Sequence, residues 1–187
     1  MAYGSKKTSS GKEISADENR LLPNVGIQEN CTIKGVFELS DDNKYASMIF
    51  VQSNGAEVSH KEWDNDDEAS QDDLNRRIKH ICTKLVSEAE FDTLPETNSF
   101  AEYINAVNAL IQGKTEGMFR MLFHYNNKGY VCVPRYPNFI EKMEVKPSKI
   151  TVSKYVAERL VRKAAPQADP ELMDAGLDQD LPDFLKQ

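Results

Sequence analysis

Apolar and polar residues alternate in three short stretches between residues 31 and 63, and this pattern predicts three β-strands. The first runs from Cys31 to Leu39, the second from Tyr45 to Gln52, and the third from Glu57 to Trp63. The polar segment SDDNK separates the first two. Asn54-Gly55 separates the second from the third and is a strong signal for a hairpin turn. Gly35, within the first stretch, predicts a bulge or a bend.

Helical periodicity replaces the alternation after residue 73. The apolar face of a first predicted helix comprises Leu74, Ile78, Ile81, Cys82 and Leu85. A second helix is predicted to begin at Ser99, which can form a capping box with Glu102, and to end at Gly113. Its apolar face comprises Phe100, Tyr103, Ile104, Val107, Leu110 and Ile111.

Two further strands are predicted in GMFRMLFHY and YVCVP, on either side of the turn NNKG. Phe119, Met121 and Phe123 alternate with their neighbours, and we expect them in the core. The segment SKYVAERLVRKAA predicts a short helix near residue 155.

The order is therefore three strands, a helical insertion and two strands. We predict a mainly β protein with a helical insertion, of the α+β class. An OB-fold, a five-stranded Greek-key barrel, has this order, with the helices between strands three and four. Other small barrels share the order. The bend predicted at Gly35 suits the first strand of such a barrel.

Composition divides the chain into three parts. Residues 1–20 are polar and lack an apolar period, so we expect a disordered N-terminal segment. Residues 21–164 form the predicted OB-fold domain. Residues 165–187 are acidic and interrupted by prolines, and we expect a disordered tail there.

The charge is unevenly distributed along the chain. The formal net charge of −7 argues against nucleic acid as a partner when taken alone. Residues 21–73, however, hold twelve acids and three bases, whereas residues 74–164 hold fifteen bases and nine acids. This basic middle part is more informative than the total charge.

The sequence also bears on the compartment. No apolar run is long enough to span a membrane, and the N-terminus lacks the apolar centre of a signal peptide. The three cysteines are sparse and odd in number, which is typical of a reducing compartment. We therefore expect a cytoplasmic protein with no membrane partner.

Catalytic and metal-binding motifs find little support. His60, His80 and His124 have no recognisable nucleophile nearby in the sequence. The acids of the segment DNDDE, residues 64–68, lack the glycine of a calcium loop, and we interpret them as a solvated loop that leads into a helix. We expect no enzyme, no cofactor and no metal. A nuclease that uses the acids of residues 64–73 with magnesium is a third alternative.

Aromatic and basic residues gather in two regions, and they are candidates for contacts with single-stranded nucleic acid, which binds by stacking and by phosphate contacts. The candidates are Lys44, Tyr45, Lys61, Trp63, Tyr125, Lys128, Tyr130, Arg135 and Tyr136. Trp63 is compatible with core or surface, and the three later tyrosines favour the surface. The basic residues of the first helix, among them Arg76 and Arg77, form either a solvated face or a DNA contact.

The acidic tail ends in a small apolar cluster. A solubilising role explains the acids but not the apolar residues at the end. Such a segment can dock in a basic-rimmed pocket of another protein. The candidate partner-binding residues are Asp178, Asp180, Leu181, Pro182 and Phe184.

Together, the hairpin ASMIFVQSNGAEVSHKEW, the segment YNNKGYVCVPRYPNFIE and the acidic end with Pro182 and Phe184 resemble single-stranded DNA-binding proteins with an OB-fold, especially those of tailed bacteriophages. The resemblance implies a role in DNA replication, recombination or repair, in the host cytoplasm for a phage protein, with replication or recombination proteins as partners of the tail. It implies stacking by Trp63 and the three later tyrosines. It implies phosphate contacts for Lys44, Lys61, Lys128 and Arg135. The main alternative is a non-catalytic protein-interaction or virion-associated adaptor.

Overall fold

A computed structural model of the 187-residue chain describes residues 21–65, 67–135 and 138–161. The segment expected to be disordered at residues 1–20 lies outside the described residues. The same holds for Tyr136 and for the acidic tail with its candidate partner-binding residues.

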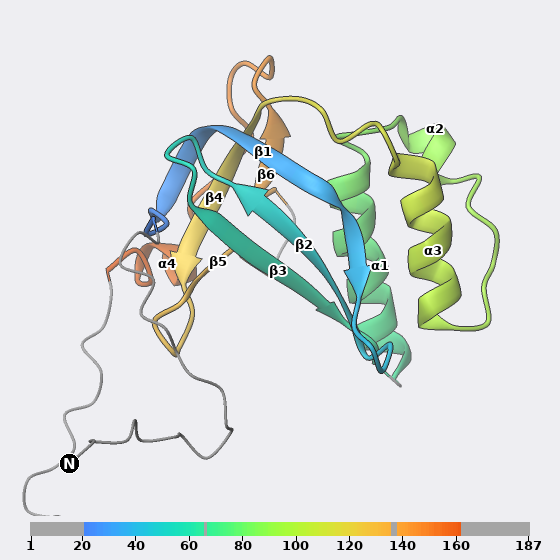
Figure 1. Ribbon diagram of the computed structural model, residues 1–187. Helices are drawn as coiled ribbons and strands as arrows, with labels where there is room; N and C mark the ends of the chain where they lie inside the picture. Colours follow the sequence, from blue (N-terminus) through green and yellow to red (C-terminus); the bar gives the residue numbers. More distant parts are fainter. Residues whose placement is uncertain (1–20, 66, 136–137, 162–187) are drawn as a thin grey trace, which may run out of the picture.

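Six strands and four helices are present in the described residues (Figure 1). They are β1 (Gly26–Leu39), β2 (Tyr45–Val51), β3 (Glu57–Trp63), α1 (Glu68–Cys82), α2 (Glu88–Phe91), α3 (Phe100–Ile111), β4 (Phe119–Tyr125), β5 (Val131–Cys132), β6 (Ile140–Lys142) and α4 (Lys154–Ala157). The strands pair antiparallel, and the α+β class with a helical insertion after β3 is confirmed.

The sheet follows the order β3-β2-β1-β4-β5, and β6 pairs with β4 as well, at Phe119–Met121, while β5 pairs at His124 and Tyr125. The ends of this path, β3 and β5, approach each other but exchange no ladder hydrogen bonds among the described residues. The sheet is therefore open in this structure. The prediction of five strands was wrong by one, because three-residue β6 is too short to show an alternating pattern.

The long strand β1 serves two partners. Its second half pairs with β2, from Thr32↔Val51 to Leu39↔Ala46, and its first half pairs with β4, from Gly26↔Phe123 to Cys31↔Phe119. The register shifts between Lys34 and Glu38, where Gly35 has a φ of +75°. The bulge or bend predicted at this glycine is confirmed. Glycine suits this position because any other side chain would be strained at a positive φ.

Asn108 of α3 closes the bulge that follows Gly35. Its side-chain amide accepts a hydrogen bond from the backbone N–H of Phe37 at 3.0 Å and donates one to the carbonyl of the same residue at 2.7 Å. The shifted register takes both groups away from β2, and Asn108 replaces the missing partners. The contact also fixes α3 against β1.

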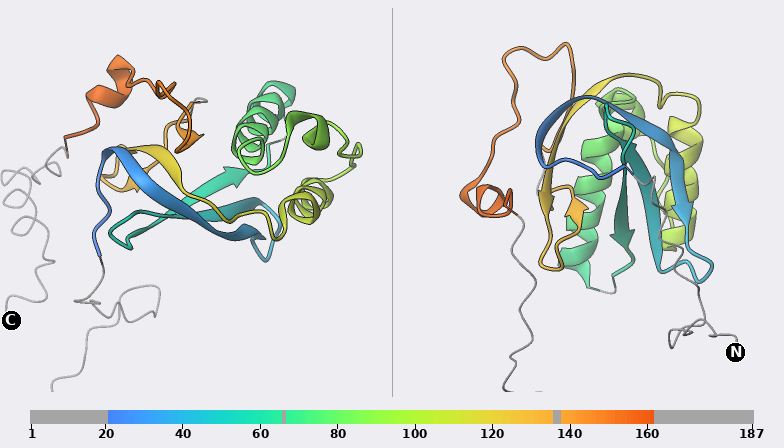
Figure 2. Two further views of the ribbon diagram at one scale, coloured as in Figure 1. Left: turned by 90° about the horizontal axis from the view of Figure 1, so that it is seen from above. Right: turned by 60° about the vertical axis from the view of Figure 1, so that its left-hand side comes forward.

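The core lies between the sheet and α1 and α3. Both predicted apolar helix faces are confirmed, with Leu74, Ile78 and Ile81 of α1 and Ile104 and Val107 of α3 buried. The expected core residues Phe119, Met121 and Phe123 are buried as well. In Figure 1, α1 lies behind β1, β2 and β3, and no helix lies in front of them; the side view of Figure 2 agrees.

The predicted capping box of α3 forms only in part. Ser99 caps the helix by accepting a hydrogen bond from the N–H of Glu102 at 3.2 Å. The Glu102 carboxylate, however, accepts from the N–H of Asn98 at 3.0 Å instead of that of Ser99. None of the helices in the described ranges is both long and apolar enough to cross a membrane.

We expect Asn108→Ala to lower the free energy of unfolding by about 1–3 kcal/mol, because it leaves two backbone groups of Phe37 without partners. Asn105→Ala, on the exposed side of the same helix, is the matched control and should be neutral or slightly stabilising, because alanine favours helix. Urea unfolding of both variants measures the difference. Equal effects of the two substitutions would show that the bulge does not need Asn108.

Candidate functional site

Tyr45, Lys61 and Trp63 meet on the outer face of β2 and β3, and we call them the Trp63 cluster. Tyr45 lies directly opposite Trp63 in the β-ladder, with 4.9 Å between the ring centroids. The Lys61 Nζ atom lies 4.1 Å from the centroid of the Tyr45 ring. Trp63 is 52% exposed, so the surface interpretation holds for the only tryptophan of the chain.

The outward direction of this cluster follows from what β3 buries on its other face. Val58 and Glu62 are buried, and His60 is nearly so, while Ser59, Lys61 and Trp63 between them are exposed. Since successive side chains of a strand alternate between its two faces, the buried set determines where Lys61 and Trp63 point.

Glu62 is the centre of a buried polar network under the sheet. Its two carboxylate oxygens share a bifurcated hydrogen bond from Arg77 Nε, and Oε2 also accepts from Arg77 Nη2 at 2.7 Å. The carboxylate contacts His60 Nε2 at 2.8 Å. Burial alone would raise the pKa of Glu62. The hydrogen bonds from His60 and Arg77 outweigh burial and hold this pKa below its usual value.

This network corrects one prediction. Arg77 was expected on the outer surface of the first helix together with Arg76, but its side chain is only 11% exposed and is committed to Glu62. Arg76 is 65% exposed and pairs with Asp73 one turn earlier, as a solvated helix face would. Periodicity marks Arg77 as polar but does not reveal a carboxylate on a neighbouring strand.

Lys44 lies beside the Trp63 cluster at the start of β2. It is 74% exposed and makes a loose ion pair with Asp42, with 3.6 Å between Nζ and Oδ2. Such exposed pairs contribute little to stability, so this cation is available to another anion.

A second group of rings and cations lies where the β4–β5 hairpin meets α4, and we call it the hairpin cluster. Its members are Tyr125, Lys128, Tyr130, Tyr155 and Arg159. Tyr130 is 68% exposed and Lys128 is exposed beside it, whereas Tyr125 is half-buried.

The segment at α4 completes the hairpin cluster. The guanidinium carbon of Arg159 lies 3.7 Å from the centroid of the Tyr155 ring. Arg159 Nη2 donates to Asn127 Oδ1 at 2.9 Å, and the N–H of Tyr125 donates to the carbonyl of Arg159 at 2.9 Å. Sequence analysis did not single out Tyr155 and Arg159. The available signal was their spacing of four residues within the segment predicted as a short helix, although α4 ends at Ala157, before Arg159.

The structure does not bring the eight described candidate residues into one site. The Trp63 cluster lies at the Leu39 end of β1 and the hairpin cluster at its Gly26 end. Fourteen residues separate these ends, roughly 45 Å along a straight strand and less along the bent β1. Arg135 lies apart from both, at 3.6 Å from Asp73 of α1.

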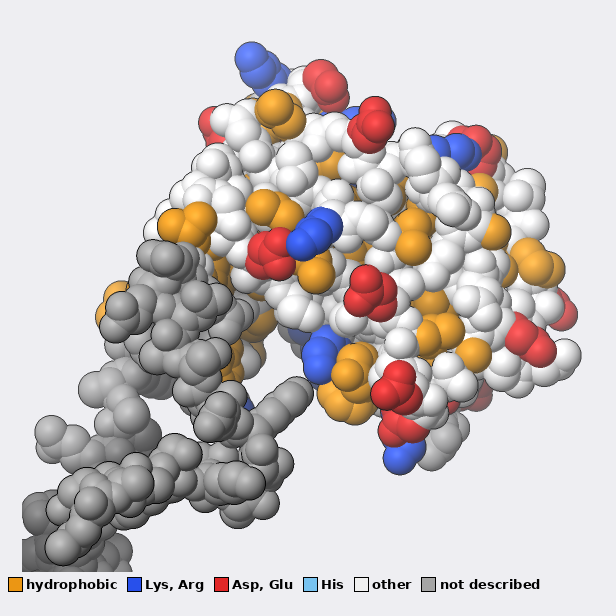
Figure 3. All heavy atoms as spheres, viewed as in Figure 1, with side chains coloured by type: hydrophobic (Ala, Val, Ile, Leu, Met, Phe, Trp, Pro, Cys, Tyr) orange, Lys and Arg blue, Asp and Glu red, His pale blue; other side chains and the backbone are white. Residues whose placement is uncertain are grey.

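The surface that carries the Trp63 cluster is mixed in charge. Figure 3 shows this face with hydrophobic side chains scattered among both blue and red ones. Lys34, for example, pairs with Glu57 across the outer side of β1–β2–β3 at 2.7 Å. This face therefore offers apolar and cationic contacts without a continuous basic track.

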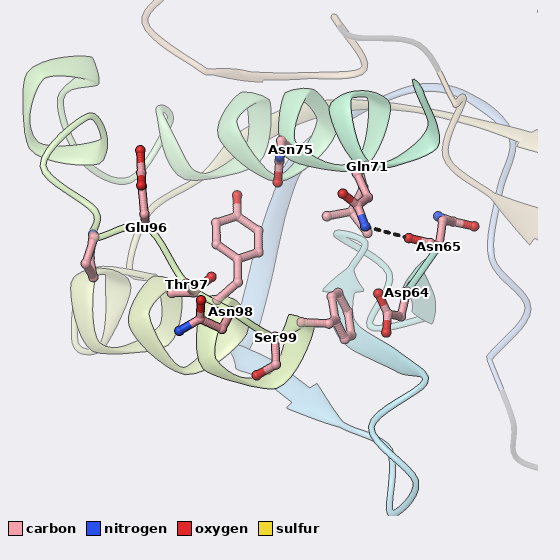
Figure 4. A pocket seen from close by; sticks show the side chains of 12 residues that line it. Asp64, Asn65, Gln71, Asn75, Glu96, Thr97, Asn98 and Ser99 are labelled. Atoms are coloured by element: carbon pink, nitrogen blue, oxygen red, sulfur yellow. Dashed lines mark hydrogen bonds between the residues drawn. The ribbon is translucent and has the colours of Figure 1, made fainter. Parts of the chain in front are cut away.

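A groove of about 680 Å³ lies beside Trp63, between α1 and α3. Its lining is rich in amides and hydroxyls, with Asp64 and Asn65 after β3, Gln71 and Asn75 on α1, and residues 96–99 before α3 (Figure 4). The side chain of Gln71 donates to the carbonyl of Asn65 at 2.9 Å. Because Asp64 and Glu96 are the charged residues of the lining, this groove disfavours phosphate.

The acidic segment after β3 has a structural role. Asp67 caps α1, since its carboxylate accepts from the N–H of Ser70 at 2.9 Å. Within the described part of the chain, no three His, Cys, Asp or Glu side chains are grouped as metal ligands would be.

No family model matches the chain, and no curated protein and no solved structure matches it either.

We expect Arg77→Ala to lower the free energy of unfolding at pH 7 by roughly 2–4 kcal/mol, because it leaves the buried Glu62 carboxylate with His60 as its remaining side-chain partner. Arg76→Ala is the matched control and should cost less than about 0.5 kcal/mol, because Arg76 is exposed. Chemical denaturation compares the two. Similar losses would mean that the buried ion pair is not a main support of β3.

The difference between Arg77→Ala and the unchanged protein should also depend on pH. The folded-state pKa of Glu62 is lowered, so its contribution is present above the unfolded-state pKa of about 4.3 and is lost as the pH falls through the folded-state value. The stability difference should therefore shrink on acidification below about pH 4.3. Unfolding curves measure this stability difference between pH 3 and pH 7, a range that extends about one unit or more to either side of this pKa. A difference that is constant across this range would contradict the role of the carboxylate charge.

Proposed function

We propose that this chain is an OB-fold protein that binds single-stranded DNA with little sequence preference. In this proposal it acts without catalysis in DNA replication, recombination or repair in the cytoplasm, and its acidic tail recruits partner proteins. The observation that carries the proposal is the Trp63 cluster, an exposed indole with a tyrosine and a lysine on the outer face of β2 and β3.

The topology supports the fold part of the proposal. Strand β1 pairs with both β2 and β4, the helices fall between β3 and β4, and β5 turns back towards β3. A five-stranded Greek-key barrel has this arrangement when β3 and β5 close, and its ligand face includes the strands two and three that carry Trp63.

The chemistry of the Trp63 cluster suits unpaired bases. Every base has a flat face, and stacking on an aromatic side chain contributes about 1–3 kcal/mol per base. Trp63 offers a half-exposed indole, and Lys61 and Lys44 supply cations beside it. A duplex hides the faces of its bases in the stack, so an exposed ring of this kind favours single strands.

The hairpin cluster would provide a second contact for the same DNA strand. It adds the exposed Tyr130, Lys128 and the Tyr155–Arg159 pair at the other end of β1. The hairpin cluster has two cations, Lys128 and Arg159, and no acid among its members, so it attracts phosphate more than the mixed-charge Trp63 face does. Binding should therefore weaken as salt rises.

The second candidate is a non-catalytic adaptor that presents the same rings to another protein. The mixed charges around the Trp63 cluster favour it, because protein interfaces combine aromatic residues with both signs of charge (Figure 3). Salt distinguishes the two candidates, since counterion release makes DNA binding steeply salt-dependent, whereas an apolar contact is not.

We expect oligothymidylate to quench the fluorescence of Trp63 on binding, a direct reading because the chain has one tryptophan. Trp63→Ala should weaken binding roughly 5- to 150-fold, the loss of one stacked base. Trp63→Phe keeps a ring and should retain most of the affinity. Fluorescence anisotropy of a labelled oligothymidylate at low and moderate salt measures all three proteins.

Lys61→Gln and Lys34→Gln form a matched pair for the cation, because both lysines lie on the outer face and only Lys61 covers the Tyr45 ring. The first should weaken binding more than the second. Absence of binding at low salt, or equal affinity of the unchanged protein and Trp63→Ala, would overturn the proposed function and favour the adaptor.

A further inference from the structure

A pocket of about 290 Å³ lies behind the sheet, where the C-terminal end of α1 meets β6 and the loop after it. We call it the lysine pocket. Its lining includes His80, Lys84, Ile140, Lys142, Lys149 and Ile150. None of these residues belongs to the Trp63 cluster or to the hairpin cluster, and α1, about 22 Å long, separates the pocket from Trp63.

Three lysines line this pocket against one carboxylate, that of Glu141. Among the described residues, no carboxylate lies within ion-pair distance of Lys84, Lys142 or Lys149. Glu141 offsets part of the charge at Lys84, and both of its carboxylate oxygens already accept hydrogen bonds. Its Oε1 atom accepts from Arg120, and its Oε2 atom accepts from the backbone N–H of Lys149 at 2.9 Å.

The lowered pKa of Lys84 shows that its charged form is disfavoured in this pocket. Its side chain is half-buried, and the pKa of Lys84 is lowered by burial and by the nearby charge of Lys149, partly offset by Glu141. A half-buried ammonium group is unfavourable without a counter-charge, and Glu141 supplies only part of that charge for three lysines. The excess of positive charge in the lining points to an anionic ligand.

His80 adds a neutral hydrogen-bond donor. Its Nε2 atom accepts from the N–H of Asn138 at 2.9 Å, so the proton of the neutral ring lies on Nδ1. Burial, with a contribution from Lys84, lowers the pKa of His80 to about 4, and the ring is therefore neutral at pH 7. The edge of the ring packs against the buried Phe139, which holds its orientation.

We propose that the lysine pocket binds the phosphate group of a nucleotide. Three lysines supply charge and donors for the phosphate oxygens, and they outweigh the partial negative charge at the C-terminal end of α1. Ile140, Val145 and Ile150 give the pocket an apolar part that a bare phosphate would leave empty. The volume is close to the lower limit for small-ligand sites, about 300 Å³.

The nucleotide is either free or part of a bound strand, since both present the same phosphate. Thymidine 5′-monophosphate, inorganic phosphate and thymidine are the probes, with isothermal calorimetry in a phosphate-free buffer. We expect the monophosphate to bind more tightly than inorganic phosphate, and thymidine not to bind. The monophosphate should also raise the melting temperature, because it binds the folded state.

The principal variant is Lys142→Gln/Lys149→Gln, because both side chains are exposed and their loss leaves the fold intact. It should weaken monophosphate binding about tenfold or more. Lys114→Gln/Lys146→Gln removes two exposed cations outside the pocket and should change binding less than about twofold. Lys84→Gln tests the half-buried lysine and should weaken binding without loss of stability. Trp63→Ala should bind the monophosphate like the unchanged protein.

Oligothymidylate binding by the two double variants identifies the source. A weaker affinity of Lys142→Gln/Lys149→Gln than of its control places a strand phosphate in the pocket. An unchanged affinity, with monophosphate binding lost, identifies a free nucleotide. The proposal is overturned if neither the monophosphate nor inorganic phosphate binds, or if both double variants bind the monophosphate equally. Monophosphate binding without any oligothymidylate binding would sustain the pocket and reject the proposed function.

Discussion

The double pairing of β1 determines where every other element of this protein lies. One strand provides the edge for β2 with its second half and for β4 with its first, so it has to change direction between them. The positive φ of Gly35 permits this change, and the amide of Asn108 satisfies the backbone groups of Phe37 that lose their ladder partners. As a result, the end of β3 and the end of β4 lie at opposite ends of the same strand, and each carries its own group of rings and cations.

The second constraint is that the side chains of β3 alternate between the two faces of the sheet, with the Glu62 carboxylate on the buried face. The buried Glu62 carboxylate is stabilised by its contacts with Arg77 and His60. Because these contacts hold Glu62 on the inner face, its neighbours Lys61 and Trp63 point outward. The outward rings contribute little to folding, since Trp63 packs mainly on the Tyr45 ring and remains half exposed. Large aromatic side chains that stay exposed to water and pack against few neighbours are typical of binding surfaces. The same reasoning holds for Tyr130 in the hairpin cluster.

Local pattern was sufficient to predict β2, β3, β4, the two long helices and the second half of β1, because each repeats a period over several turns or pleats. The turn NNKG indicated the two-residue strand β5. The first half of β1, from Gly26, was missed because it does not alternate. Local pattern could not predict β6, which has three residues, or the ladder partners of β1, which depend on the whole sheet. It singled out Tyr45, Lys61 and Trp63 by residue type, and the β2–β3 hairpin brings them together by pairing Tyr45 with Trp63. It missed the ion pair of Arg77 with Glu62 and the lysine pocket, whose members come from α1 and from a loop far along the chain. Contacts of that kind leave no periodic signal.

The distribution of charge connects the three surfaces. The chain is acidic as a whole, yet the acids of the described part concentrate in residues 21–73, which supply the Trp63 face and part of the groove beside it. The cations of residues 119–161 lie on β4, β6, α4 and the loops between them. Lys61 and Arg159 each cover a tyrosine ring, whereas Lys84, Lys142 and Lys149 line one pocket and make no ion pair among the described residues. In the proposal, an anion therefore gains most in the lysine pocket, where cations outnumber the one carboxylate, and a base gains most at Trp63, where a ring is exposed. A ligand that carries both groups, as a nucleic acid strand does, is the chemistry that uses both surfaces.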